Sequence, residues 1–150
     1  MSTVTKKELQ RKGFTLIELL VVIAIIGILG VLAVWALGTA KQKARDAVRL
    51  SDLKQLQNSL ELYYGDKTDY PPGNGAVLGA GNVSCLNDQG WLAPGCANAY
   101  LPRVPADPQT PNHNYVYTKG ANTYTITATL EGNVNGLSGA VKLTPAGIGK

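Results

Sequence analysis

The chain has 150 residues, of which 45% are hydrophobic and 16% are charged, and its formal net charge is +4. Residues 1–13 contain four basic side chains and one acidic side chain, so they account for three of these four charges and the chain from Phe14 onward carries +1. A protein this close to neutral has no overall field that would hold a polyanion, which argues against a general nucleic-acid-binding protein. The length suits one small domain with an additional segment.

The most informative stretch is KGFTLIELL at residues 12–20, together with the apolar run that follows it. Residues 19–36 contain no polar side chain, and a transmembrane helix needs about 20 mainly apolar residues. Glu18 lies near the start of this run. An ionisable residue inside a membrane helix is costly and indicates a function, unless Glu18 lies at the level of the lipid headgroups. The spacing alone leaves both interpretations open.

Four features coincide here: Gly13, Phe14 directly after it, Glu18 as the fifth residue counted from Phe14, and an apolar helix behind a short basic leader. This combination resembles the N-terminus of type IV prepilins and of type II secretion pseudopilins. The resemblance implies that a membrane-embedded prepilin peptidase cuts between Gly13 and Phe14 and methylates the new amine of Phe14. It also implies that Glu18 neutralises the Phe14 amine of a neighbouring subunit, and a carboxylate inside an apolar helix bundle does need such a cationic partner.

Beyond Gly38 the pattern becomes amphipathic. Apolar residues recur mostly three and four positions apart, at Ala40, Ala44, Val48, Leu53, Leu56, Leu60 and Tyr63. Polar surface is expected from the charged residues between them, namely Lys43, Asp46, Arg49, Asp52, Lys54 and Glu61. We predict one helix over residues 14–64, apolar over 14–37 and amphipathic over 38–64, with Gly65 as its C-cap before Pro71 and Pro72. Two helices broken near Gly38 are the alternative.

The remaining chain is predicted to fold as loop and sheet. Residues 65–112 are rich in Gly, Pro and Asn and show no strand period, so they are expected to form a loop region in which Trp91 and Leu92 pack under the helix. Four carboxylates there, Asp66, Asp69, Asp88 and Asp107, are expected to be solvated. Residues 113–150 are predicted to form an antiparallel sheet with a turn at residues 119–122, because apolar residues alternate on both sides of it (Tyr115, Tyr117, Tyr124, Ile126, Ala128 and Leu130). A weaker third strand is expected at 139–144.

These elements predict an α+β, pilin-like fold, with residues 1–13 removed as a leader. The resemblance extends to the segment at residues 101–117, where Leu101-Pro102, Asp107-Pro108 and Tyr115 resemble the major pseudopilin of type II secretion systems. That family usually binds Ca²⁺ near its C-terminus. No acidic residue follows Glu131 in this chain, and Ca²⁺ commonly needs several carboxylates, so we expect no metal and no other cofactor.

The two cysteines, Cys85 and Cys96, are predicted to form a disulfide if the domain is exported into an oxidising compartment. Free or metal-bound thiols are the alternative, but the spacing is not typical of zinc sites. The single histidine, His113, has no free thiol to pair with under the disulfide interpretation, and no phosphate-binding loop or nucleophile motif is present. The sequence therefore predicts a protein that is not an enzyme.

The resemblance implies a structural subunit of a pseudopilus or a type IV pilus, with the helix in the inner membrane and the globular part outside before assembly. The expected partners are copies of the same chain, the prepilin peptidase, membrane lipid, and a membrane assembly platform with its cytoplasmic ATPase. One alternative is a minor pilin whose loop binds DNA or a surface, although only Arg103 and Lys119 flank that loop as cations and no nucleic-acid partner is expected. Another is a secreted domain cut after Ala40.

Overall fold

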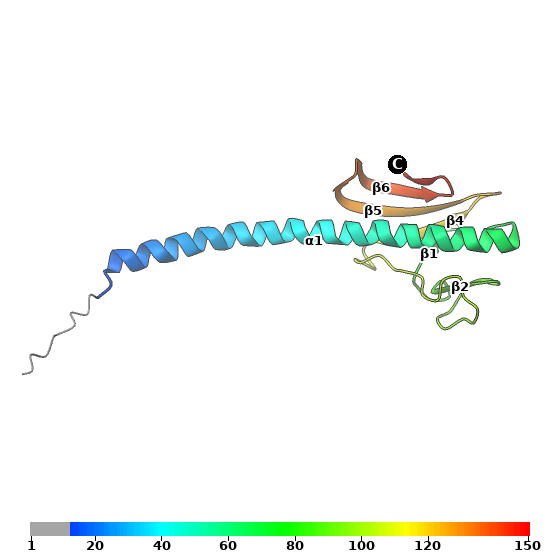
Figure 1. The fold of residues 1–150 in the computed structure, drawn as a ribbon, viewed down its shortest axis with the longest axis horizontal. Helices are drawn as coiled ribbons and strands as arrows, with labels where there is room; N and C mark the ends of the chain where they lie inside the picture. Colours follow the sequence, from blue (N-terminus) through cyan, green and yellow to red (C-terminus); the bar gives the residue numbers. More distant parts are fainter. Residues whose placement is uncertain (1–12) are drawn as a thin grey trace, which may run out of the picture. The chain divides into compact units, whose positions relative to one another are not determined.

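The computed structural model describes residues 13–150. The rest of the predicted leader, including its four basic residues, lies outside the described residues. The chain forms two compact units, Met1–Thr39 and Ala40–Lys150. In the first unit the described structure is the apolar part of the helix, and the second unit is an α+β globular domain (Figure 1).

Helix α1 extends over Leu16–Lys67 without interruption. It contains no proline, and its isolated glycines cost up to about 1 kcal/mol each relative to alanine, which is too little to end a helix of this length. The predicted single helix is therefore confirmed, and the alternative of two helices broken near Gly38 is wrong.

The predicted C-cap of α1 is wrong by three residues. Gly65 is still helical, and the residue that leaves the helix is Thr68, with a φ of 56°. The backbone N–H of Thr68 donates to the carbonyl oxygen of Tyr64 at 2.7 Å, which satisfies one of the last helical carbonyls. A left-handed residue ends the helix, as expected, but it is a threonine rather than the nearby glycine.

The main sheet has five antiparallel strands in the order β1-β4-β5-β6-β7. Its strands are β1 (Ala76–Val77), β4 (Val116–Lys119), β5 (Tyr124–Val134), β6 (Leu137–Thr144) and β7 (Gly147–Gly149). The predicted hairpin around residues 119–122 corresponds to β4 and β5, in which Tyr117 pairs with Ile126. The third strand, which was predicted at residues 139–144, corresponds to β6. This α+β arrangement confirms the predicted pilin-like fold class.

The core of the globular unit lies between α1 and the sheet. Leu53, Leu56 and Leu60 are fully buried on one side of the helix. The six predicted inward-facing residues of the hairpin are also buried and belong to the same core, namely Tyr115, Tyr117, Tyr124, Ile126, Ala128 and Leu130. The alternation that marks a half-buried strand therefore identified the correct face of the sheet.

The region predicted as loop, residues 65–112, contains three short strands, so this prediction is partly wrong. Besides β1, the strands β2 (Cys85–Asn87) and β3 (Gly90–Leu92) form a separate two-stranded antiparallel sheet. In the view of Figure 1, β5 and β6 lie on one side of α1 and β2 lies on the other. Trp91 packs against Tyr117 of β4, with ring centroids 5.2 Å apart, and lies against the core that α1 and the sheet share. Strands of two or three residues are too short for a period-two pattern to show.

Candidate functional site

The N-terminal end of α1 is organised by Thr15 and Glu18. The Oε2 atom of Glu18 accepts hydrogen bonds from the backbone N–H of Thr15 at 2.8 Å and from its Oγ1 at 2.7 Å. In return, the backbone N–H of Glu18 donates to Oγ1 of Thr15 at 3.3 Å. This is a capping box, in which a Thr at the N-cap and a Glu three residues later satisfy each other's backbone donors. The Thr-x-x-Glu spacing was visible in the sequence, but our prediction did not use it.

The structure places the predicted cleavage and methylation residues, Gly13 and Phe14, immediately before this cap. Both are exposed, and Phe14 has 89% of its surface accessible. Within the described residues, Glu18 forms no ion pair, and its only hydrogen-bond partner is Thr15. The carboxylate is therefore held at the start of the helix without a cationic partner among residues 13–150.

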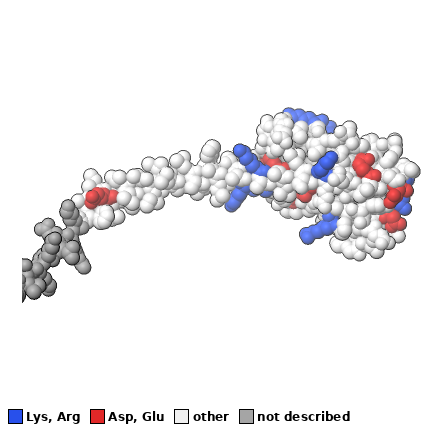
Figure 2. All heavy atoms as spheres, in the orientation of Figure 1, with Lys and Arg blue, Asp and Glu red and all other residues white. Residues whose placement is uncertain are grey.

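The apolar part of α1 is exposed within its own unit, as far as the structure describes it. Its large hydrophobic side chains, from Phe14 to Leu37, have between 47% and 89% of their surface exposed. Figure 2 shows this stretch as white atoms with acidic atoms near its start. The helix is long and apolar enough to cross a membrane. Because exposing this much apolar surface to water is unfavourable, the stretch requires lipid or other protein around it.

A second cluster of polar residues is buried in the globular unit, and the sequence did not predict it. Arg49 is fully buried, and its guanidinium donates to Asp107 from Nε at 2.8 Å and from Nη2 at 3.0 Å. Its Nη1 donates to Asp46 and to Glu131, both at 2.7 Å. Arg45 adds two further bonds to Glu131. We call these five residues the buried charge cluster.

The cluster corrects three expectations from the sequence. Asp46 and Arg49 were assigned to the polar surface of the helix but are buried, whereas Ala44 and Val48 of the predicted apolar stripe are exposed. Asp107 was expected to be solvated, yet only 2% of its surface is exposed. The reason is that the three carboxylates bring enough hydrogen bonds and charge to compensate the desolvation of Arg49, which a single-helix pattern cannot reveal.

The buried charge cluster connects helix α1, strand β5 and the segment before β4. Asp46 also accepts from the backbone N–H groups of Glu131 at 3.0 Å and Gly132 at 2.8 Å, which fixes α1 to strand β5. Burial opposes the ionisation of Asp107, but hydrogen bonds from Arg49 and from the backbone of Gln109 hold its pKa below the ordinary value. The hydrogen bond from Arg45 is the main cause that lowers the pKa of Glu131 to about 2, against the opposing effect of burial. Both carboxylates are therefore charged at neutral pH.

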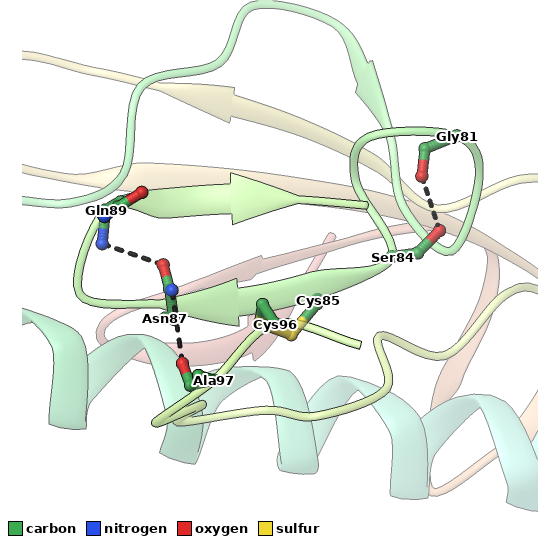
Figure 3. Close-up of a disulfide and its surroundings, with 7 residues drawn as sticks. All are labelled: Gly81, Ser84, Cys85, Asn87, Gln89, Cys96 and Ala97. Atoms are coloured by element: carbon green, nitrogen blue, oxygen red, sulfur yellow. Dashed lines mark hydrogen bonds between the residues drawn. A yellow bond between two sulfur atoms is a disulfide. The ribbon is translucent and has the colours of Figure 1, made fainter. Parts of the chain in front are cut away.

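The predicted disulfide between Cys85 and Cys96 is present, with the two Cα atoms 6.2 Å apart (Figure 3). Nearby, the side-chain amide of Asn87 donates to the carbonyl oxygen of Ala97 at 3.3 Å, and the Asn87 oxygen accepts from the backbone N–H of Gln89 at 2.9 Å. The disulfide therefore attaches the segment after β3 to strand β2, where apolar content is low. It also removes both thiols that a Cys–His site with His113 would need.

Residues 13–150 contain no group of three or more His, Cys, Asp or Glu side chains arranged to hold a metal ion. The four carboxylates of residues 65–112 that were expected to be solvated all have a side-chain partner, with Asp66 accepting from the hydroxyl of Tyr100 and Asp88 lying 3.9 Å from Lys67. Asp107 belongs to the buried charge cluster, and Asp69 accepts from Lys119 at 2.7 Å. That second contact also occupies one of the two cations considered for DNA binding.

Comparison with known proteins identifies the family. Residues 9–34 match the prokaryotic N-terminal methylation motif. Over 103 residues the chain is 38% identical to the type II secretion system core protein G of Escherichia coli (strain K12), an alignment that covers 66% of this chain and 67% of that protein. None of the solved structures gives a significant match. With the long apolar helix and the antiparallel sheet already described, these similarities show that the chain belongs to the type IV pilin-like pseudopilins.

Proposed function

We propose that this protein is a structural subunit of a type II secretion pseudopilus and is not an enzyme. The observation that carries the proposal is the exposed apolar half of α1 with the carboxylate of Glu18 at its start, which has no cationic partner in the described part of the chain. Such a helix can be stored in lipid and then transferred into a bundle of identical helices, because both surroundings cover its apolar surface. The similarity to core protein G favours a secretion pseudopilus over a type IV pilus.

Processing would create a cationic partner for Glu18. A prepilin peptidase would cut between Gly13 and Phe14, both of which are exposed just before the cap, and would methylate the new amine of Phe14. The methylated amine remains a cation at neutral pH. In the assembled filament, the Phe14 amine of one subunit would neutralise Glu18 of its neighbour, since an unpaired charge inside an apolar bundle is strongly unfavourable.

The cellular arrangement follows from this function. Before assembly the apolar helix would span the inner membrane, with the leader in the cytoplasm and the globular unit outside, where the Cys85–Cys96 disulfide is stable. Assembly would need the membrane platform and its cytoplasmic ATPase. The minor-pilin alternative has less support, because the Lys119 ammonium is already paired with Asp69 and leaves Arg103 as the only other cation considered for DNA binding.

The role of Glu18 is tested by assembly of two variants in the host membrane. Glu18→Gln keeps the size of the side chain but removes its charge, and Leu20→Ala changes a neighbouring apolar position without changing charge. We expect the Glu18→Gln chain to be cleaved and kept in the membrane but to form no sedimentable filaments, whereas Leu20→Ala still assembles. Filaments of Glu18→Gln at the wild-type yield would contradict the proposed pairing.

A further inference from the structure

Trp35 has a distinct position in the apolar part of α1. It is the only aromatic residue between Phe14 and Tyr63 in the sequence, and 73% of its surface is exposed. Tryptophan is enriched where a membrane helix leaves the hydrocarbon layer, because its indole ring is largely apolar while its N–H needs a hydrogen-bond acceptor. The position of Trp35 near the end of the apolar part therefore indicates the level of one lipid–water interface.

The length of helix from its first residue to Trp35 matches the thickness of a membrane. The helix begins at Leu16, and 20 residues extend from there to Trp35. At about 1.5 Å per residue they rise roughly 30 Å, which is the thickness of the hydrocarbon layer. When Trp35 lies at one boundary, the Gly13–Phe14 junction therefore lies at the other. The Glu18 carboxylate accepts from the backbone N–H of Thr15, so its charge is held at that second boundary as well.

The residues that follow the apolar part of α1 carry the next charges of the helix. The hydroxyl of Thr39 donates to the carbonyl oxygen of Ala36 at 2.9 Å, so this polar group is satisfied within the helix and does not require water. Lys41 and Lys43 are the first charged residues after the apolar part. Both are exposed, and within the described residues neither forms an ion pair.

These two lysines reach the level of the lipid headgroups. They follow Trp35 by six and eight residues, or about 9 and 12 Å along the helix, and the headgroup layer beyond the hydrocarbon is about 5–8 Å thick. Side chains of an α-helix tilt towards its N-terminus, so each long lysine side chain leans back towards the headgroups. The carboxylate that follows next in the chain, Asp46, is enclosed in the buried charge cluster and does not neutralise them. The phosphate group of an anionic lipid supplies a counter-charge at this level.

We propose that Trp35, Lys41 and Lys43 bind the headgroups of the outer lipid leaflet and so fix the depth of α1 in the membrane before assembly. The inference rests on the proposed storage of this helix in lipid and adds the residues that set its depth. At this depth the Gly13–Phe14 junction is held at the opposite membrane surface, where a peptidase reaches it. The Glu18 carboxylate then lies at the edge of the hydrocarbon layer rather than inside it.

Fluorescence quenching measures the depth of Trp35 in the full-length chain, inserted into phosphatidylcholine vesicles that contain phosphatidylglycerol. Trp91→Phe removes the other tryptophan, whose Nε1 atom has no hydrogen-bond partner within residues 13–150. We expect lipids brominated near the headgroup to quench Trp35 more than lipids brominated at the end of the acyl chain. Lys41→Leu/Lys43→Leu extends the apolar part, so the helix should sink and the deeper bromine should become the more effective quencher. Lys54→Leu, at an exposed position further along α1, should leave the order unchanged.

Chemical labelling tests the two lysines separately. A water-soluble amine reagent is added to the inserted chain, and each modified lysine is identified by mass spectrometry. Lys41 and Lys43 should be labelled more slowly than Lys142, which is exposed on the sheet. This protection should be lost in vesicles of phosphatidylcholine alone and in high salt, because screening weakens the attraction between the ammonium and phosphate groups.

Three results would overturn the inference. Labelling of all three lysines at one rate would exclude the headgroup contact, and protection that persists without anionic lipid would show that a protein surface covers the lysines instead. Stronger quenching of Trp35 by the bromine at the end of the acyl chain, with both lysines intact, would exclude the proposed depth. Quenching by neither lipid would show that the helix does not enter the membrane, which contradicts the proposed function itself. Formation of the Cys85–Cys96 disulfide checks that each variant folds.

Discussion

Arg49 of α1 and Asp107 of the segment before β4 are joined by two parallel hydrogen bonds, although they lie 58 positions apart in the chain. Both side chains are completely shielded from solvent. A buried arginine with this geometry holds carboxylates on both sides of it, since it also donates to Asp46 and Glu131. The stability of the globular unit should therefore depend on this residue more than on any exposed charge.

Replacing Arg49 by methionine is expected to lower the free energy of unfolding of the globular unit by about 3–5 kcal/mol, because the change leaves buried carboxylates without their counter-charge. Lys54→Met, at an exposed position on the same helix, should change stability by less than about 0.5 kcal/mol. Urea unfolding of the detergent-solubilised chain, followed by tyrosine and tryptophan fluorescence, compares the two. Equal midpoints for Arg49→Met and Lys54→Met would show that the buried charge cluster is not stabilising.

Acid should reduce the stability that the buried charge cluster contributes to the globular unit. The pKa of Glu131 is about 2 in the folded chain, below its ordinary value of 4.5. A carboxylate with a lowered folded pKa contributes stability above the unfolded pKa and loses it as the pH falls towards the folded pKa. Stability should therefore decline between about pH 4.5 and pH 2, and Asp107, whose pKa is also lowered, should contribute to the same decline.

The variant Glu131→Gln measures the contribution of Glu131 to this loss of stability in acid. This variant should be less stable than the wild type at pH 7 and should show a shallower fall of the thermal midpoint between about pH 4.5 and pH 2, because glutamine does not titrate. Thermal unfolding at several pH values measures both slopes. Parallel slopes for the two proteins would exclude Glu131 as a contributor to acid sensitivity.

The sequence predicted the parts of this fold that follow a simple period. The uninterrupted helix was confirmed because no strong helix breaker lies within it, and the hairpin faces at Tyr117 and Ile126 were confirmed because burial on one side repeats along each strand. Burial of Asp46 and Arg49 could not be predicted, since it depends on acidic residues supplied by distant segments. At the candidate site the residue types were apparent, but the capping box between Thr15 and Glu18 was overlooked although its spacing is local. The end of α1 could not be predicted either. The helix ends at Thr68, which adopts a left-handed conformation, although the sequence favours the nearby Gly65 for that conformation.

Removing the disulfide should destabilise the region around β2 and β3. The disulfide joins residues with a sequence separation of 11 and so reduces the conformational entropy of the unfolded chain. The variant Cys85→Ser/Cys96→Ser is therefore expected to lower the free energy of unfolding by about 2–3 kcal/mol. Limited proteolysis should cut the chain between β3 and Cys96 faster in the variant than in the wild type, because this stretch belongs to no strand. Unchanged protease resistance, together with an unchanged unfolding midpoint, would be inconsistent with this role.

Gly79 is predicted to be intolerant of any side chain. It has a φ of +77°, and an added Cβ would lie 2.7 Å from Cβ of Ala106 and 2.9 Å from its backbone. Gly75 has a similar φ of +68°, but a Cβ there would meet nothing within 4 Å. Gly75→Ala should thus cost only the backbone strain of about 1–2 kcal/mol, while Gly79→Ala should cost clearly more. A comparable loss of stability in both variants would show that the segment around Ala106 moves freely to make room.

The central claim is that the chain is a processed filament subunit, and the most direct test is the N-terminal residue and mass of the mature protein from the host membrane fraction. We predict that the mature chain begins at Phe14 and is heavier by one methyl group than its sequence. This result would show processing at the Gly13–Phe14 junction and supply the amine that Glu18 is proposed to bind. A mature chain that begins at Lys41 in the medium, or an uncut chain in the membrane, would contradict the claim.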